Sequence, residues 1–191
     1  MNTFKKTTLA LAVFTLASGA IAQTAPAPAP APTASPITAN ITITNDYRYR
    51  GISQSNFLPA IQGGFDYAHE SGFYIGNWNS SVSSQLYTNG SGVESDLYAG
   101  YKKEVLGVTL DVGSYNYFYP RASVAKTNYD TKEIYAGVAK GPVSVKVSQS
   151  LGDYFATSNS RGTRYFQADV TYPVAGTKVS VLAHAGKTDV A

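Results

Sequence analysis

Charged side chains that could act on a solute recur at every second position of extended segments. In ITANITITNDYRYRG, residues 37–51, the charged residues Asp46, Arg48 and Arg50 alternate with tyrosines. Alternate residues of a strand point to the same face, so we expect these three groups on one face, with Asp66 of the next segment opposite them. Such a cluster could select solutes by charge in a water-filled lumen, or it could fill a narrow barrel as a salt-bridge network. The residues expected to line this lumen are Asp46, Arg48, Arg50, Asp66, Glu94, Asp96, Glu133, Lys146 and Asp169.

The residues most often used in catalysis and metal binding are scarce. The sequence contains two histidines, His69 and His184, and no cysteine. Neither histidine has the spacing of a metal site, and no nucleophile motif accompanies them for Ser-His-Asp chemistry. We therefore expect no catalytic residues, no metal ion and no cofactor, and the sequence does not indicate an enzyme.

From residue 37 onward, the chain has the pattern of strands separated by turns. Apolar and aromatic residues alternate with polar ones, and clusters of turn residues separate the segments. The last four prolines, Pro59, Pro120, Pro142 and Pro173, fall at segment ends, where a missing N–H group does least harm. We predict nine strands, at residues 37–49, 59–69, 72–82, 93–103, 107–119, 129–139, 142–151, 163–172 and 177–186.

Each predicted strand has an apolar and a polar face. On the strand at 72–82, for example, the pattern assigns Tyr74 and Trp78 to the apolar face, and Asn77 and Asn79 to the polar face. Alternation does not tell which face meets water. A soluble barrel buries its apolar face, whereas an outer-membrane barrel turns that face toward lipid.

The connections between the strands favour the membrane arrangement. Short and long connections alternate along the chain: AHESG, KKEVLG, AKGP and YPVAGT are short, and RGISQSNFL, SSQLYTNGSG, PRASVAKTN and GDYFATSNSRG are long. In an up-and-down sheet, alternate connections lie at the same end, so one end has tight turns and the other has long loops, as in outer-membrane barrels. The predicted fold class is therefore all-β, an antiparallel up-and-down transmembrane β-barrel. A soluble exported β-barrel or sandwich is the alternative.

Aromatic residues make up 13% of the chain, and many of them lie near the predicted strand ends. Rings at both margins of an apolar band form the interfacial girdles of membrane barrels. The ladder of Tyr115, Tyr117 and Tyr119 could belong to such a girdle, pack in the lumen or form a track for sugars or aromatic solutes. The residues predicted to be interfacial are Tyr47, Tyr49, Phe65, Tyr67, Tyr74, Trp78, Tyr101 and Tyr172.

The N-terminal region has the pattern of an exported protein. Lys5 and Lys6, an apolar run over residues 7–20 and an A-x-A site predict a signal peptide over residues 1–22. The Ala/Pro-rich residues 23–36 predict a disordered linker. Without the signal peptide the formal net charge falls from +3 to about +1, so the composition gives no support for a nucleic-acid partner.

Two tracts resemble a known family. NDYRYRGISQS (45–55) with PAIQGGFDYAHESGFYIGNWNSSV (59–82), and EIYAGVAKGPVSVKVSQS (133–150), are similar to the proteobacterial TorF-type porin family, formerly described as conserved hypothetical outer-membrane proteins. The resemblance implies an outer-membrane barrel with a transport role, and it implies no catalytic or binding residues. Members of that family are usually longer, and barrels usually have an even strand number. We therefore expect the barrel domain at 37–191 to lack its C-terminal strands.

Three functions remain open at this stage. The first is a porin of the bacterial outer membrane, surrounded by outer-membrane lipid, through which small polar solutes diffuse passively. The second is a plugged barrel with a structural or adhesive role. The third is a soluble periplasmic β-barrel that binds a ligand in an apolar interior. The oligomeric state has no readable signal in the sequence.

Overall fold

The computed structural model describes residues 35–191, and every regular element in this part of the chain is a strand. Among these residues there is no helix that qualifies as a candidate membrane span. The predicted signal peptide lies outside the described residues, as does the predicted linker up to residue 34.

Nine strands form one antiparallel sheet in which each strand pairs with the next long strand along the chain. Two short hairpins stand in the connections, β2 (Arg48–Tyr49) with β3 (Ile52–Ser53), and β8 (Ser123–Val124) with β9 (Thr127–Asn128). The strands of the sheet are β1 (Ile37–Thr44), β4 (Ala60–Ala68), β5 (Phe73–Ser81), β6 (Val93–Val105), β7 (Val108–Phe118), β10 (Thr131–Lys140), β11 (Val143–Ser150), β12 (Arg164–Pro173) and β13 (Ser180–Asp189).

The predicted strand number is confirmed, and seven of the nine strands have both ends within two residues of the prediction. The last strand begins and ends three residues later than predicted. The first prediction, 37–49, was wrong at its C-terminal end, because β1 stops at Thr44 and the chain turns away before β2. Alternation continues through this turn, so periodicity alone gave no sign of it.

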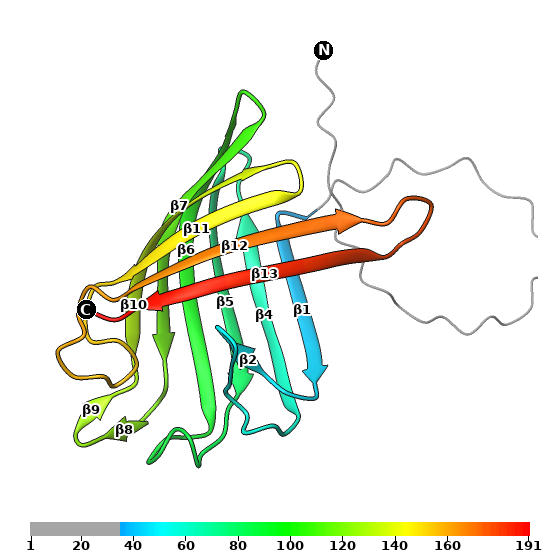
Figure 1. Cartoon of the computed structure of the whole chain (residues 1–191). Coiled ribbons are helices and arrows are strands. Elements are labelled where there is room, and N and C mark those ends of the chain that lie inside the picture. The colour runs from blue at the N-terminus through cyan, green and yellow to red at the C-terminus, as the bar shows by residue number, and fades with distance from the viewer. Residues whose placement is uncertain (1–34) are drawn as a thin grey trace, which may run out of the picture. The chain divides into compact units, whose positions relative to one another are not determined.

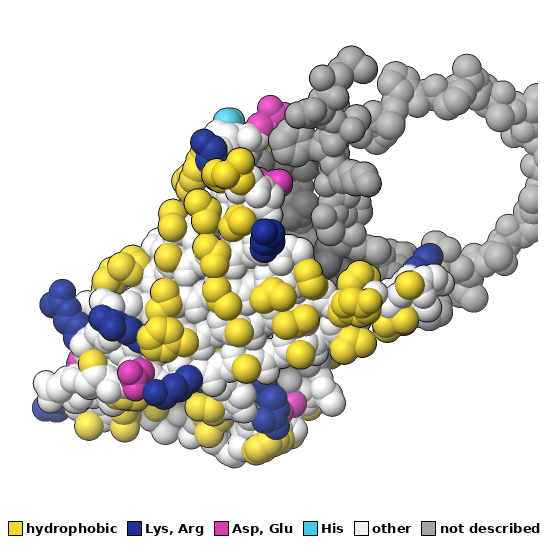
Figure 2. Space-filling model, turned by 45° about the horizontal axis from the view of Figure 1, so that its top comes forward, with side chains coloured by type: hydrophobic (Ala, Val, Ile, Leu, Met, Phe, Trp, Pro, Cys, Tyr) yellow, Lys and Arg dark blue, Asp and Glu magenta, His cyan; other side chains and the backbone are white. Residues whose placement is uncertain are grey.

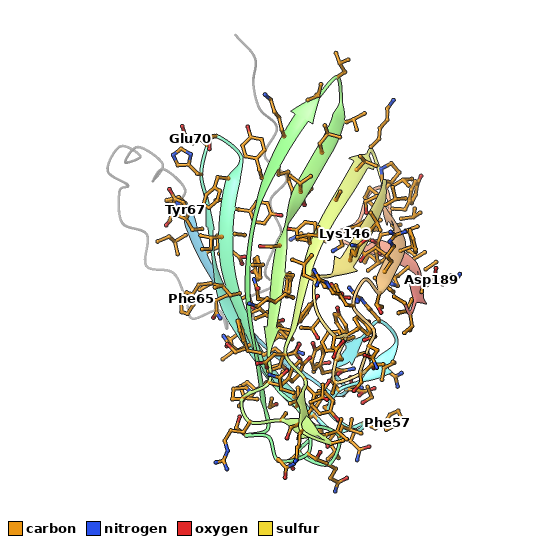
Figure 3. All side chains as sticks on the ribbon, turned by 90° about the vertical axis from the view of Figure 1, so that its left-hand side faces the viewer. Phe57, Phe65, Tyr67, Glu70, Lys146 and Asp189 are labelled. Carbon is orange, nitrogen blue, oxygen red and sulfur yellow. The ribbon has the colours of Figure 1, made fainter. Side chains whose placement is uncertain are left out.

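Long and short connections lie at opposite ends of the sheet. Figure 1 shows the β2 and β8–β9 hairpins at one end, among the long loops. Figure 3 places Phe57 at this end and Glu70 at the other, where the turns are short. The loops do not simply project outward, because the hairpin β2–β3 folds back against the inner face of the sheet, as its contacts with β7, β10 and β12 show.

The sheet curls, but it does not close on itself among the described residues. The strand order begins at β1 and ends at β13, and these two edge strands do not pair with each other. All eight pairings between neighbours are antiparallel. The two edges therefore run in the same direction, and a direct ladder between them would be parallel. A curved nine-stranded sheet is what the structure shows of the predicted barrel.

The two faces of the sheet differ sharply in polarity. On the outer face, large apolar side chains are exposed. Figure 2 shows them in rows, with few charged side chains between the rows. On the inner face, Glu94, Asp96 and Glu133 are buried. This is the reverse of a soluble protein, where apolar groups are inside. The outer-facing residues include Ile41, Ile43, Phe65, Val112, Val145 and Val170.

The assignment of faces on β5 was wrong. Tyr74 and Trp78 face the interior, and Asn77 and Asn79 lie on the outer face. The amide of Asn79 donates a hydrogen bond to Asn77 at 2.7 Å and accepts one from Ser95 at 2.7 Å. The outer amide groups thereby form hydrogen bonds without water. The polar residues of β5 can therefore lie outside while the large rings of Tyr74 and Trp78 lie inside.

Glycines on the inner face allow tyrosine rings to lie flat against the sheet. The ring of Tyr98 covers Gly76, its register partner on the neighbouring strand, and Tyr135 covers Gly113 in the same way. A Cβ atom at Gly113 would stand 2.5 Å from the Tyr135 hydroxyl oxygen. The absence of side chains at these glycines therefore leaves space for rings along the wall.

Candidate functional site

The inner face gathers most of the charged residues that alternation pointed to. Seven of the nine predicted lumen residues face the interior: six project from strands, and the seventh, Arg50, reaches in from the β2–β3 hairpin. The other two, Asp46 and Arg48, form an ion pair at 2.7 Å between the loop that follows β1 and strand β2, and Arg48 also borders one cavity of the interior. The six strand residues are Asp66, Glu94, Asp96, Glu133, Lys146 and Asp169.

The expected cluster of Asp46, Arg48, Arg50 and Asp66 does not exist. Asp66 pairs with Thr38, at the end of β1 away from Asp46. Asp46 instead organises the loop by accepting hydrogen bonds from Ser53 at 2.5 Å and Ser55 at 3.3 Å. The bond from Ser53, with help from Arg48, lowers the pKa of Asp46. These serines make a tight turn favourable where a straight strand was predicted.

Arg50 stands at the tip of the hairpin and enters the interior. Arg50 and Gly51 connect β2 to β3 with φ angles of 50° and 84°, the positive signs that a type I′ turn requires. The guanidinium donates two hydrogen bonds to the Glu133 carboxylate, at 2.8 and 2.7 Å, and a third to the Tyr154 hydroxyl at 2.9 Å. The side chains of Arg50 and Glu133 are 8% and 2% exposed. This is a fork-to-fork pair, the strongest class of charge-assisted hydrogen bonding.

The surroundings of Arg50 keep it charged and fixed. The guanidinium lies 4.1 Å from the ring centroid of Tyr165 and 4.7 Å from that of Tyr49. Burial by itself would lower the pKa of Arg50, but the hydrogen bonds to Glu133, together with the charges of Glu133 and nearby tyrosines, raise the pKa above its usual value. Arg50 is therefore a permanent cation that ties the first long loop to the middle of the sheet.

A cluster of tyrosines packs between the long loops and the sheet. Tyr87 and Tyr119 stack with ring centroids 4.5 Å apart. Tyr49 donates a hydrogen bond to Tyr117 at 2.8 Å, and Phe155 packs edge-on against both rings. Tyr115, Tyr117 and Tyr119 thus pack inside rather than at an outer girdle, which selects the lumen-packing alternative for this ladder.

The predicted interfacial aromatics divide into two groups. Phe65, Tyr67, Tyr101 and Tyr172 are on the outer face, and Figure 3 shows Phe65 and Tyr67 projecting from one flank. The other four lie inside, so the prediction of an outer girdle was wrong for Tyr47, Tyr49, Tyr74 and Trp78. The first two belong to a loop that folds inward, and the other two belong to the reversed faces of β5.

Two neighbouring cavities lie along the inner face. One, of about 400 Å³, is lined by Arg50, Trp78, Asp96 and Glu133 among others. The second, of about 560 Å³, lies toward the short turns. The two cavities share four lining residues, so they are neighbouring parts of one interior. The shared residues are Tyr98, Tyr115, Tyr135 and Lys146.

Tyrosine–carboxylate pairs occupy the wall near the short turns. Tyr74 donates a hydrogen bond to Asp111 at 2.6 Å and also contacts the hydroxyl of Tyr135, and Tyr98 donates one to Asp66. The ammonium group of Lys146 lies 5.3 Å from the ring centroid of Tyr135. The carboxylates here have partners, so this part of the interior is polar and internally hydrogen bonded.

Each histidine has a polar partner nearby. His184 contacts Asp169 at 2.5 Å and the Tyr165 hydroxyl at 2.9 Å, and His69 contacts Ser71 in a turn. Within residues 35–191, no group of three or more His, Cys, Asp or Glu side chains could hold a metal ion. The roles of Tyr154 and Tyr165 were not predicted from the sequence, although Tyr165 and Phe166 are successive residues of a predicted strand and must therefore face opposite sides.

Comparisons with known proteins give one match. A family model described as "Bacterial protein of unknown function (Gcw_chp)" matches residues 28–191. Neither the curated proteins nor the solved structures contain a significant match.

Proposed function

The chain belongs to Gcw_chp, a bacterial protein family of unknown function, and we propose that it is an outer-membrane β-barrel of the TorF-type porin class. In this proposal, small polar solutes diffuse passively through an interior lined with charges and tyrosines. The observation that carries the proposal is the reversed polarity of the sheet, with carboxylates buried inside and aliphatic side chains exposed outside.

The exposed apolar surface is the first support. Ile41, Ile43 and Val112 are 73%, 77% and 52% exposed, and each lies in a strand rather than in a loop. Soluble monomers rarely expose a contiguous apolar patch larger than about 600 Å². An outer face that is largely apolar has a natural partner in lipid. The same observation argues against a soluble barrel with an apolar interior.

The second support is the asymmetry of the connections. Four long connections lie at one end of the sheet and four short ones at the other. In outer-membrane barrels the long loops face the outside of the cell and the short turns face the periplasm. In this proposal, β1 begins on the periplasmic side, which fits a chain exported with its N-terminal region first.

Selection in this proposal would depend on the pair of cavities and on Arg50. The ion pair of Arg50 with Glu133 joins the β2–β3 hairpin to strand β10. Figure 3 shows side chains crowding together at the end with the long loops. Space remains beside the ion pair, about 400 Å³, bordered by acidic and basic groups. Small polar solutes fit such a passage, and large or apolar ones do not.

Conductance across a planar bilayer tests the proposal directly. The full chain, inserted in the bilayer, is expected to give discrete current steps in potassium chloride. A conformation check on the same preparation, by the gel shift of unboiled samples, establishes that the barrel is folded. Folded and inserted protein that carries no current would overturn the porin proposal.

A plugged barrel is the second candidate, and one observation favours it. The hairpin β2–β3 folds inward, and its residue Tyr49 packs against Tyr117 and Phe155 from two other parts of the chain. Such packing could fill the lumen and leave the outer loops as the functional part. This alternative predicts that correctly inserted protein carries no current across the bilayer.

A further inference from the structure

A groove lies in the apolar outer face, on the part of the sheet that runs from β7 to β13. Its larger part, about 850 Å³, is lined mainly by apolar side chains such as Val112 and Phe166. A smaller part, about 390 Å³, is lined by Ile134, and it shares Ala136 and Phe166 with the larger part, so the two parts adjoin. Ala136 stands between Val112 and Val147 in the register. Its small side chain leaves a hollow between theirs.

The smaller part of the groove is bordered by a guanidinium group. Arg164 and Gln149 both line it, and Arg164 Nε donates a hydrogen bond to Gln149 at 3.0 Å. Lys132 occupies the outward position before Ile134 on β10. Within residues 35–191, neither Arg164 nor Lys132 forms an ion pair. Two basic side chains near this part of the groove are therefore not neutralised by the described chain.

The outer face carries mainly positive charge. Alternation places seven of the eight carboxylates of the sheet strands on the inner face. The exception, Asp189, pairs with Lys187 at 3.5 Å. The outward basic residues of the sheet strands are Lys103, Lys132, Lys140, Arg164 and Lys187.

These basic residues lie near the ends of the strands. Because β10 and β12 begin and β13 ends at the long loops, Lys132, Arg164 and Lys187 lie at that end of the sheet. Lys103 and Lys140 lie near the short turns. Figure 2 shows basic side chains at the left margin of the apolar rows, on the side where Figure 1 places the C-terminus. Lipid head groups lie at the margins of an apolar band in a membrane. A groove that joins this band to Arg164 therefore matches the polarity of a lipid molecule.

We propose that the groove binds a lipid that has a phosphate head group. An acyl chain lies over Ala136 and Ala168, and the phosphate contacts Arg164 and Lys132. A guanidinium suits a phosphate because it can donate two parallel hydrogen bonds. The bond from Nε to Gln149 leaves the two terminal nitrogens of Arg164 for this contact. The inference rests on the part of the proposed function that places the outer face in lipid, and it goes further by assigning one site and one class of head group.

Native mass spectrometry of the full chain tests the site, because it counts the lipids that a folded protein retains. The chain is folded in uncharged detergent micelles and titrated with dioleoyl phosphatidic acid or with dioleoyl phosphatidylcholine, which has the same acyl chains. We expect phosphatidic acid to be retained at about tenfold lower concentration. Arg164→Gln combined with Lys132→Gln should weaken its retention about tenfold and leave that of phosphatidylcholine unchanged.

Lys103→Gln combined with Lys140→Gln is the matched control, because it removes two charges from the same face at the other end. It should retain phosphatidic acid as the unchanged chain does. Ala168→Phe fills the groove beside Ala185 and keeps every charge, so it should weaken the retention of both lipids. Glycerol phosphate, a phosphate without acyl chains, should not displace the bound lipid.

The lipid site is overturned if the two lipids are retained equally, or if the Arg164 and Lys132 substitutions have no more effect than their control. Displacement by glycerol phosphate would also overturn it, because the site would then bind free phosphate. The gel shift of unboiled samples checks folding, and Lys132→Gln alone replaces the double variant if that variant does not fold. Protein that prefers phosphatidic acid but conducts no current overturns the porin proposal and leaves the lipid site standing. Conducting protein without this preference overturns the lipid site alone.

Discussion

At the scale of single residues, the pair of Arg50 and Glu133 joins segments that are 83 positions apart in the sequence. Arg50 is the tip of a small hairpin, and Glu133 lies near the start of a sheet strand, β10. A bidentate pair at this point fixes the inward orientation of the first long loop. The packing of the tyrosine cluster depends on that orientation, because Tyr49 is the neighbour of Arg50.

Removing the positive charge of Arg50 should lower the free energy of unfolding. Arg50→Met leaves Glu133 buried without a partner, and breaking a buried pair costs about 3–5 kcal/mol of unfolding free energy. Arg161→Met, in an exposed part of a long loop, should change the free energy by less than about 0.5 kcal/mol. Urea titration of the folded chain in micelles, followed through Trp78, measures both. Equal costs for the two variants would contradict the role given to Arg50.

The sequence predicted that Arg50 and Glu133 are inward-facing charged residues, but it did not predict that they form a pair. Alternation identified Arg50 and Glu133 as inward-facing groups. The pairing could not be inferred, because it depends on a turn at residues 45–51 through which the alternation continues without a break. The turn becomes visible only through the hydrogen bonds of Asp46 with Ser53 and Ser55, and such contacts within a loop leave no periodic signal.

At the scale of strands, glycines on the inner face lie beneath the rings of tyrosines on the neighbouring strands. Gly113 lies opposite Tyr135 and beneath its ring. Gly113→Ala would place a methyl group 2.5 Å from both the Tyr135 hydroxyl and the Ala99 carbonyl oxygen. We expect the substitution to lower the unfolding free energy by about 1–3 kcal/mol.

Gly152→Ala is the control for this strand prediction. Gly152 has open space where a Cβ atom would stand, so its substitution should have little effect on stability. Denaturant midpoints of both variants in the same micelles give the comparison. A Gly113→Ala protein as stable as Gly152→Ala would show that the ring can move aside at no cost.

A substitution on the outer face can distinguish whether this face contacts lipid or water. Val112 lies in the middle of a strand and is 52% exposed, next to Tyr101 and Ala136 on the neighbouring strands. On a face that meets lipid, Val112→Arg should cost about 2–4 kcal/mol in bilayers. Leu106→Arg, at a turn tip and 97% exposed, should cost less than about 1 kcal/mol. Similar small effects at both positions would indicate that the face meets water.

Strand boundaries were predictable because two independent signals coincide there. Alternating segments end at turn residues, and Pro120, Pro142 and Pro173 mark strand ends in the structure within two residues. The faces of β6 and β10 were predicted correctly as well, since Glu94 and Asp96 on β6 and Glu133 on β10 alternate with mostly apolar residues. On β5 the polar residues are amides rather than charges, and paired amides such as Asn77 and Asn79 can stay outside.

At the scale of the whole molecule, one pattern unites these observations. The buried carboxylates and most of the tyrosines face the interior, and most large aliphatic side chains of the strands face out. The long loops fold against that interior at one end only. An apolar outer face of this kind is stable when an apolar medium covers it. In our proposal that medium is the lipid of the membrane.

The central claim is that the outer face meets lipid, and one measurement tests it most directly. The natural full-length gene product is fractionated into periplasm and outer membrane, and each fraction is run unboiled and boiled on a denaturing gel. We expect the protein in the outer-membrane fraction, with the unboiled form migrating faster than the boiled form, as a closed barrel does. Soluble periplasmic protein with no shift between the two samples would contradict the claim.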